Sequence, residues 1–288
     1  MKIKSIISAI LIIVITFCIS GCSVEIKLTD NSDNVRVHFL DVGQGDSIFI
    51  ELTDGKSMLI DASTVEYGEG IADYIKDSGY SKIDYLVATH PHADHIGGMQ
   101  DVVEQLEIGE IYMPKASTTT KTYKNLLKAI KAKGNKINTA KAGNTIYSDS
   151  SLGIDILAPN SDSYEEINDY SVVIKLVYGS KSFLFTGDAE KLSENEITAD
   201  VSANVLKVGH HGSSTSSSDK FIKRVNPEYA VISCGEGNSY GHPHKETIKT
   251  LNKYDIEVFR TDTMGTIIAQ TDGESLEITD KNKSIESN

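Results

Sequence analysis

The sequence contains too few cysteines for a disulfide framework. Three cysteines occur among 288 residues, namely Cys18, Cys22 and Cys234. The first two lie in an N-terminal segment that we expect to be cleaved or lipidated, so Cys234 stands alone in the rest of the chain. Disulfide-stabilised domains carry paired cysteines. The same shortage excludes a metal site built from thiolates, which are common ligands of structural zinc.

Basic residues are also scarce. The chain has 28 Lys and Arg residues against 41 Asp and Glu residues, which gives a formal net charge of −13. Loss of Lys2 and Lys4 with the N-terminal segment would bring this charge to −15. Broad binding of nucleic acid depends on Lys and Arg side chains that displace counterions, so the composition argues against it. Catalysis on a phosphodiester stays compatible with an acidic surface, because bound metal ions reverse the local field.

The N-terminal apolar run is too short for a membrane-spanning helix. It covers residues 6–19, follows Lys2 and Lys4, and is succeeded by small residues. A transmembrane helix needs about 20 apolar residues, whereas a short apolar run after positive charges is typical of an export signal. We therefore predict a signal peptide over residues 1–21. A plain signal peptide and an uncleaved anchor are both alternatives to the lipoprotein signal described next.

The end of this segment contains a possible lipidation site. The tetrapeptide Ile19-Ser20-Gly21-Cys22 resembles the bacterial lipobox, in which the cysteine is lipidated and becomes the new N-terminus. The acyl chains of such a cysteine bury enough CH₂ groups for stable anchoring. We therefore expect Cys22 to hold the protein at the extracytoplasmic face of the cell membrane. The polar residues 22–34 would form a tether.

Residues 35–279 have the pattern of one α/β domain, and residues 280–288 form a polar tail. Short β-branched runs alternate with turn residues and single amphipathic stretches. Strands are predicted at 35–40, 47–52, 56–61, 84–89, 152–157, 171–178, 182–187, 204–208, 229–233, 256–260, 265–270 and 275–279. Helices are predicted at 69–78, 99–106, 121–133, 217–225 and 244–253, the fourth with its N-cap in the serine-rich stretch 213–218. Strands dominate both ends, which favours two packed sheets with helices outside.

Seven of the eight histidines gather in three short segments. One segment has His90, His92 and His95, the second has His210 and His211, and the third has His242 and His244. A lone histidine is usually a core or surface residue, but each of these segments follows a predicted strand. The three groups are therefore expected at one edge of the sheets. Imidazole and carboxylate ligands suit zinc, manganese or iron.

The spacing His-x-His-x-Asp-His predicts two metal positions side by side. Residues i and i+2 of a tight loop point the same way, so His90 and His92 are expected to share a first ion. Asp94 and His95 are then available to a second ion close by. Two ions roughly 3.5–4 Å apart clamp the attacking and leaving oxygens of a displacement.

The motif and its surroundings resemble the metallo-β-lactamase superfamily. The stretches "FLDVGQGDSIFI", "LIDAS", "ATHPHADHIGG", "FLFTGDAE", "LKVGHHGSSTS" and "NSYGHPH" occur in the order found in the soluble domain of ComEC-type DNA-uptake proteins, and phosphorylcholine esterase domains have similar landmarks. The resemblance covers about 35–279, here in a stand-alone lipoprotein form. It implies an αβ/βα four-layer sandwich with two divalent metal ions, zinc or manganese.

The resemblance also implies roles for the later residues. Asp188, in Thr-Gly-Asp, would bridge both ions, and His211 would be the late ligand of the metal site. Neighbours on an extended segment point in opposite directions, so only one of His210 and His211 is expected to face the metal. We favour His211 as that ligand, with His210 facing substrate, and the reverse assignment is the alternative. His242 is either a ligand or a phosphate contact, and we expect the latter. The predicted catalytic residues are thus Asp94, His210 and His242.

The sequence departs from many superfamily members in the middle of the chain. No histidine lies between residues 96 and 209, where those members supply another ligand for the first ion. The first ion would then have His90, His92, Asp188 and either Asp169 or water, which predicts a weaker site that prefers manganese to zinc. We expect Asp46, Asp61 and Asp169 to orient the ligand histidines through hydrogen bonds. For Asp46 and Asp61, capping of turns is an equally good interpretation.

These expectations define a function and its alternatives. The leading prediction is an extracytoplasmic, membrane-anchored, metal-dependent hydrolase that uses a metal-activated hydroxide. Its substrate would be DNA or another extracellular phosphodiester. One alternative is a lactonase or β-lactamase that acts on an acyl substrate. Another is a non-catalytic surface-binding lipoprotein. The expected partners are the membrane, through Cys22, and the phosphodiester substrate; no stable protein partner is evident.

Overall fold

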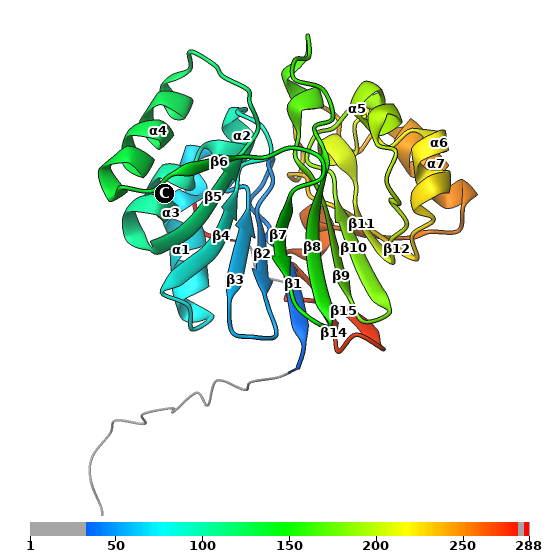
Figure 1. Cartoon of the computed structure of the whole chain (residues 1–288). Coiled ribbons are helices and arrows are strands. Elements are labelled where there is room, and N and C mark those ends of the chain that lie inside the picture. Colours follow the sequence, from blue (N-terminus) through cyan, green and yellow to red (C-terminus); the bar gives the residue numbers. More distant parts are fainter. Residues whose placement is uncertain (1–32, 282–284, 288) are drawn as a thin grey trace, which may run out of the picture. The chain divides into compact units, whose positions relative to one another are not determined.

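A computed structural model describes residues 33–281 and 285–287 (Figure 1). The predicted signal peptide, Cys22 and most of the predicted tether lie outside the described residues. Within the described ranges, no helix is both long and apolar enough to cross a bilayer.

Two mixed β-sheets form the centre of the described chain (Figure 1). The first sheet has the order β15 (Leu276–Asp280), β14 (Ile267–Thr271), β1 (Val35–Phe39), β2 (Ile48–Glu51), β3 (Ser57–Ile60), β4 (Lys82–Val87), β5 (Glu107–Met113), β6 (Ile137–Thr139). The second has the order β13 (Glu257–Arg260), β12 (Tyr229–Ile232), β11 (Val205–Lys207), β10 (Lys181–Phe185), β9 (Val173–Tyr178), β8 (Leu152–Ala158), β7 (Thr145–Ser148). The last two strands of the chain return to the first sheet beside β1.

The two sheets pack face to face through alternating apolar residues. In β10, Phe183 and Phe185 point into the core between the sheets, while Leu184 points to the helices behind. The period of two in a strand produces this division. Phe185 meets Phe39 of β1 across the interface, with ring centroids 6.2 Å apart. The core between the sheets therefore fixes how their edges are aligned.

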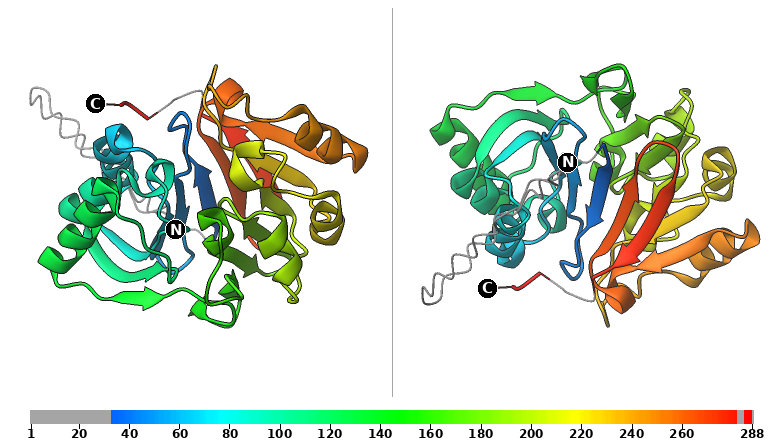
Figure 2. Two further views of the ribbon diagram at one scale, coloured as in Figure 1. Left: turned by 90° about the horizontal axis from the view of Figure 1, so that it is seen from above. Right: turned by 90° about the horizontal axis from the view of Figure 1, so that it is seen from below.

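Helices cover the outer face of each sheet (Figure 2). The first sheet is covered by α1 (Gly68–Asp77), α2 (Ala93–Ile96), α3 (Met99–Gln105) and α4 (Lys121–Lys133). The second is covered by α5 (Lys191–Glu196), α6 (Asp219–Val225) and α7 (Lys245–Lys253), and a short α8 (Thr261–Met264) follows β13. Three 3-10 turns complete the elements: η1 (Val65–Tyr67), η2 (Ile167–Tyr170) and η3 (Gly209–Gly212). The predicted αβ/βα four-layer sandwich is confirmed.

Most predicted elements are present, with shifted ends. The predicted helix N-cap in the serine-rich stretch is present. The Ser218 hydroxyl accepts a hydrogen bond from the Phe221 N–H and caps α6. Three strands and three short helices were not predicted, namely β5, β6, β7, α2, α5 and α8. At the C-terminus, Ile285 is buried in the outer core of the first sheet, although its segment was expected to be a polar tail.

Parallel strands bring the candidate site residues to one edge. Strands β3 and β4 run parallel in the first sheet, and β10, β11 and β12 run parallel in the second. Ligands of α/β proteins bind beyond the carboxyl ends of such strands. The loops that leave these ends carry Asp61, the His90–His95 cluster, Asp188, His210–His211 and the segment up to His242.

Candidate metal centre

The histidine cluster after β4 is shaped by the start of α2. His92 is the residue before this helix, so Asp94 and His95 lie in its single turn while His90 remains in the loop. The exit is tight, because a Cβ at Gly98 would lie 2.5 Å from the Ala62 carbonyl oxygen and 2.6 Å from the Gly68 Cα. The Gly-Gly pair thus holds the cluster close to β3 and its following loop.

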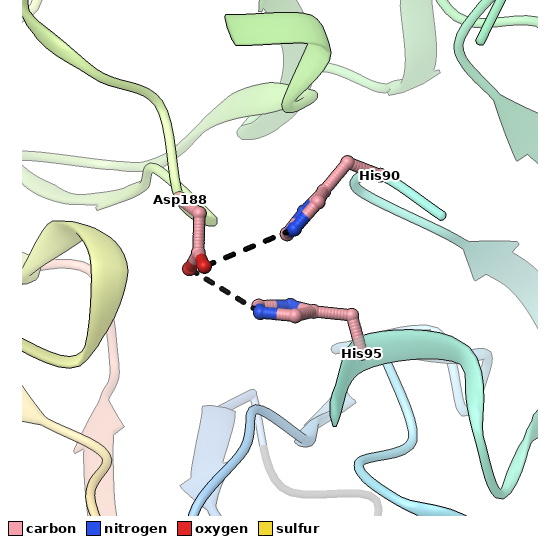
Figure 3. A group of neighbouring side chains, drawn as sticks. All are labelled: His90, His95 and Asp188. Atoms are coloured by element: carbon pink, nitrogen blue, oxygen red, sulfur yellow. Dashed lines mark ion pairs between the residues drawn. The ribbon is translucent and has the colours of Figure 1, made fainter. Parts of the chain in front are cut away.

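Asp188 lies at the centre of the site and faces His90 and His95, which both come from the segment that follows β4 (Figure 3). It is 1% exposed. Its Oδ1 lies 3.3 Å from His95 Nε2 and 3.8 Å from His211 Nε2. Its Oδ2 lies 3.8 Å from His90 Nε2 and 3.6 Å from His210 Nε2. One carboxylate therefore faces four imidazoles, two on each oxygen.

Asp61 orients His95 from behind. The His95 Nδ1–H donates to Asp61 Oδ2 at 2.7 Å, which directs Nε2 to Asp188. Asp61 is itself held by the Thr89 hydroxyl at 2.6 Å and the Thr89 N–H at 2.8 Å. Metal-binding histidines commonly have such a carboxylate behind them. Asp61 thus occupies the supporting position that the sequence analysis considered for it.

Asp46 and Lys207 form the corresponding support for His211. The His211 Nδ1–H donates to the Ser233 carbonyl at 3.0 Å, and Asp46 Oδ1 lies 3.2 Å from the same nitrogen. The other Asp46 oxygen accepts from the Lys207 ammonium at 2.8 Å, and Lys207 is fully buried. Burial would raise the pKa of Asp46, but Lys207 and His211 lower it to about 2. Lys207 was missed by the sequence analysis; its signal is a lysine in an otherwise apolar strand.

Several buried atoms of the site lack a hydrogen-bond partner. They are His95 Nε2, His211 Nε2 and Asp188 Oδ1, and all three face one another. His90 Nε2 lies 3.0 Å from His92 Nδ1, while the other His90 nitrogen faces the Thr89 hydroxyl at 3.1 Å. Unpaired buried polar atoms are costly, and a cation would satisfy these together. Candidate ligand atoms within 4.8 Å of one another occur in the trios His90–His95–Asp188 and Asp94–His95–His211.

The electrostatics of the site also favour bound cations. Burial would lower the pKa of His95, but the carboxylates of Asp188 and Asp61 outweigh it and raise this pKa well above its ordinary value. Burial also opposes protonation of His211, yet Asp188 and Asp46 raise its pKa to about 9. The buried carboxylates therefore favour positive charge close to them. The imidazole and carboxylate donors fit divalent metal ions.

A cavity of about 330 Å³ opens over this cluster. Its lining combines the expected ligands with two further aromatic rings: Gln44, His92, Ala93, Asp94, Asp188, His210, His211, Tyr240 and His242. His242 stacks on the exposed Tyr240, with ring planes at 20° and centroids 5.6 Å apart. Burial, assisted by the neighbouring histidines, lowers the pKa of His242 to about 4. A neutral His242 ring thus forms one wall of the cavity.

Asp169 is not brought together with the histidines. Its Oδ1 accepts a hydrogen bond from the Ser193 N–H at 3.2 Å, in the first turns of α5. Ser171, from the same stretch, takes the position beside the site instead. Its hydroxyl oxygen lies 3.3 Å from His90 Nδ1 and accepts from the Asp188 N–H at 3.1 Å.

The backbone at His210 and His211 differs from the expected extended segment. Both residues have φ of 52°, in the left-handed region, within η3. Their rings therefore do not point in opposite directions, and both Nε2 atoms lie within 4 Å of Asp188. The argument that only one of them faces the metal centre was wrong, because it assumed an extended backbone.

Comparison with known proteins supports the resemblance inferred from the motifs. The chain matches the family model of the metallo-beta-lactamase superfamily over residues 40–139 and 164–236. It is 30% identical to ComE operon protein 3 of Bacillus subtilis over 256 residues, and 30% identical to competence protein ComA of Neisseria gonorrhoeae over 232 residues. These alignments cover 82% and 79% of this chain but only 33% and 31% of the relatives, so the chain spans about a third of their length.

A solved structure with a similar fold is CmlA, a diiron β-hydroxylase from Streptomyces venezuelae. The TM-score is 0.53 at 12% sequence identity, over 78% of this chain and 52% of CmlA. This likeness concerns the fold alone.

Proposed function

Because the chain belongs to the metallo-β-lactamase superfamily, we propose that it is a metal-dependent phosphodiesterase. We place it at the extracytoplasmic face of the cell membrane, anchored through lipidated Cys22. The observation that carries the enzymatic proposal is Asp188, whose two buried oxygens each face a pair of imidazoles. A carboxylate in this position can bridge two cations. The two sides of Asp188 then correspond to the two ions of a displacement site.

The residues divide between two ion positions. If two ions bind, His90, His92 and Asp188 would hold the first, and Asp94, His95, His211 and Asp188 would hold the second. When bound, two divalent ions, zinc or manganese, would lower the pKa of a water molecule towards neutrality and neutralise charge on the phosphate oxygens.

The chain's own side chains supply binding and proton transfer. The Asp94 carboxylate is about one third exposed in the cavity. Its ion pair with His211, at 3.4 Å, keeps its pKa below the ordinary value against the effect of burial. It is therefore ionised at neutral pH and can accept the proton of the attacking water. His242 stands on the cavity wall as a neutral ring, placed to donate a hydrogen bond to a phosphate oxygen.

The cavity lining favours a weakly charged anion as substrate. The residues that line it include no Lys or Arg, and the whole chain is acidic. Recognition of an anion would therefore depend on the bound ions, which suits the single negative charge of a phosphodiester. The names of the relatives, a competence protein and a ComE operon protein, make DNA a substrate to test.

The proposal is tested with purified full-length protein in detergent, stripped of metal and reloaded with zinc or manganese. Substrates are bis-p-nitrophenyl phosphate, DNA oligonucleotides, a chromogenic cephalosporin and a lactone. We expect metal-dependent turnover of the phosphodiesters. Asp188→Asn should abolish turnover and lower metal content, whereas Asp169→Asn, a matched change outside the cluster, should preserve both.

Each alternative has its own outcome in this experiment. A metal-loaded protein that hydrolyses the lactam or lactone but no phosphodiester would be an acyl hydrolase. A protein that holds both ions and turns over none of the substrates would support a binding lipoprotein. Either result would overturn the phosphodiesterase proposal.

A further inference from the structure

The His210–His211 pair is held in an unusual backbone conformation. Two successive non-glycine residues with φ of 52° occupy the left-handed region, which side chains with a Cβ disfavour. Such conformations persist at functional sites where the surrounding structure fixes them. Here the His210 N–H donates to the Gly187 carbonyl at 3.0 Å, and the His210 carbonyl accepts from the Ser213 N–H at 2.8 Å. The turn is thereby tied to the loop that carries Asp188.

The left-handed pair distributes its two rings over the two oxygens of Asp188. His211 Nε2 lies on the Oδ1 side, together with His95. His210 Nε2 lies 3.6 Å from Oδ2, the oxygen that His90 also faces at 3.8 Å. Each ion position therefore receives one histidine from η3. His210 is therefore on the side of the first ion position. Many superfamily members supply a mid-chain histidine to that position, and this sequence has none there.

His210 has the same kind of support as the other candidate ligands. Its Nδ1 lies 3.1 Å from the Thr215 hydroxyl oxygen and 3.4 Å from Glu190 Oε1. Carboxylates stand in the same relation to His95 and His211, through Asp61 and Asp46. A carboxylate behind Nδ1 directs Nε2 towards a metal and raises the basicity of the ring.

We propose that His210 is the third imidazole ligand of the first ion, beside His90 and His92, and that Glu190 and Thr215 position it. His210 would then take the place of the absent mid-chain histidine, and the first position would have three nitrogens and one carboxylate oxygen. This donor set suits zinc as well as manganese. The inference rests on the metal-dependent function proposed above, and it replaces the substrate-facing role expected from the sequence.

Metal binding tests this assignment independently of catalysis. Metal-free full-length protein is titrated with Zn²⁺ against a chromogenic chelator, and bound zinc is counted by elemental analysis. The wild type should bind two ions. His210→Ala should bind one ion at wild-type affinity and lose the other, and Glu190→Gln should weaken the same site by roughly 10–100-fold. His244→Ala is the matched control, because its ring bonds to Ser214 and Tyr240, and it should keep both ions.

Two further results decide the outcome. If His210→Ala and Glu190→Gln both retain two ions at wild-type affinity, His210 is not a ligand, and a fall in turnover would assign it to the substrate. Glu190→Gln keeps the test valid if His210→Ala fails to fold, which circular dichroism would reveal. A wild type that binds two ions but hydrolyses no phosphodiester would refute the proposed function while leaving the ligand assignment intact. A wild type that binds neither zinc nor manganese would overturn both.

Discussion

Replacing Lys207 with methionine should destabilise the folded protein strongly, because Asp46 would remain buried without its cation. Both side chains are almost inaccessible, and the ammonium lies 2.8 Å from Asp46 Oδ2 and 3.1 Å from the Val208 carbonyl. At this separation and an effective dielectric constant of about 20, the attraction is roughly 6 kcal/mol before the cost of desolvation. Breaking a buried pair by removing one partner costs about 3–5 kcal/mol. For a domain of this size, that corresponds to a fall in Tm of roughly 6–20 °C.

A double-mutant cycle separates the lost pair from the lost packing. Unfolding of the full chain is followed by calorimetry for Lys207→Met, Asp46→Asn and the double variant, with metal removed. The double variant should be more stable than Lys207→Met alone, because no unpaired charge is left inside. Lys253→Met, which breaks an exposed pair with Asp219, serves as the control and should leave Tm unchanged. A Tm of Lys207→Met equal to that of the wild type, or strictly additive effects in the cycle, would refute the reasoning.

Three other perturbations follow from the same contacts and from the N-terminal sequence. Asp61→Asn should weaken zinc binding by roughly 10–100-fold in a calorimetric titration, since His95 loses its carboxylate acceptor; an unchanged Kd would contradict this. His38→Gln should reduce the decrease in the free energy of unfolding that occurs as the pH falls below about 6.5, as measured by denaturant unfolding. Burial lowers the pKa of His38 despite Glu51, so its neutral ring stabilises the fold above that pH and loses this effect on acidification; equal slopes would disprove it. Cys22→Ala should abolish incorporation of labelled fatty acid, and persistent label would exclude anchoring at this residue.

The parts of the structure that depend on local spacing were predictable from the sequence. α4 has the predicted bounds 121–133, with Thr120 as its N-cap and Gly134 at its left-handed end. The histidine cluster was recognisable because its ligands lie within six residues. By contrast, β6 has only three residues, all of them exposed, so no alternation of buried and exposed side chains marks it in the sequence.

Features that depend on distant partners were not predictable. Lys207 is a lone lysine in an apolar strand, and its partner Asp46 lies 161 positions earlier. No local pattern links the two residues. Asp169 was a reasonable substitute for the missing histidine on composition alone, but its carboxylate caps the start of α5. The residue of this stretch that lies beside the site is Ser171, because the chain leaves η2 at this position and brings its hydroxyl next to His90.

The sequence Gly-His-His-Gly explains how the chain brings two adjacent imidazoles, both candidate ligands, to Asp188. Gly209 begins the turn one residue after β11. Its N–H donates to the Ser217 hydroxyl, which fixes the entry to the turn. Gly212 leaves the turn with φ of 86°, and a Cβ there would lie 2.6 Å from Pro243. Between these glycines, the left-handed backbone directs both imidazoles to the same carboxylate. A compact turn after one strand could therefore supply a nitrogen to each proposed ion position, and under our proposal no separate histidine is needed earlier in the chain.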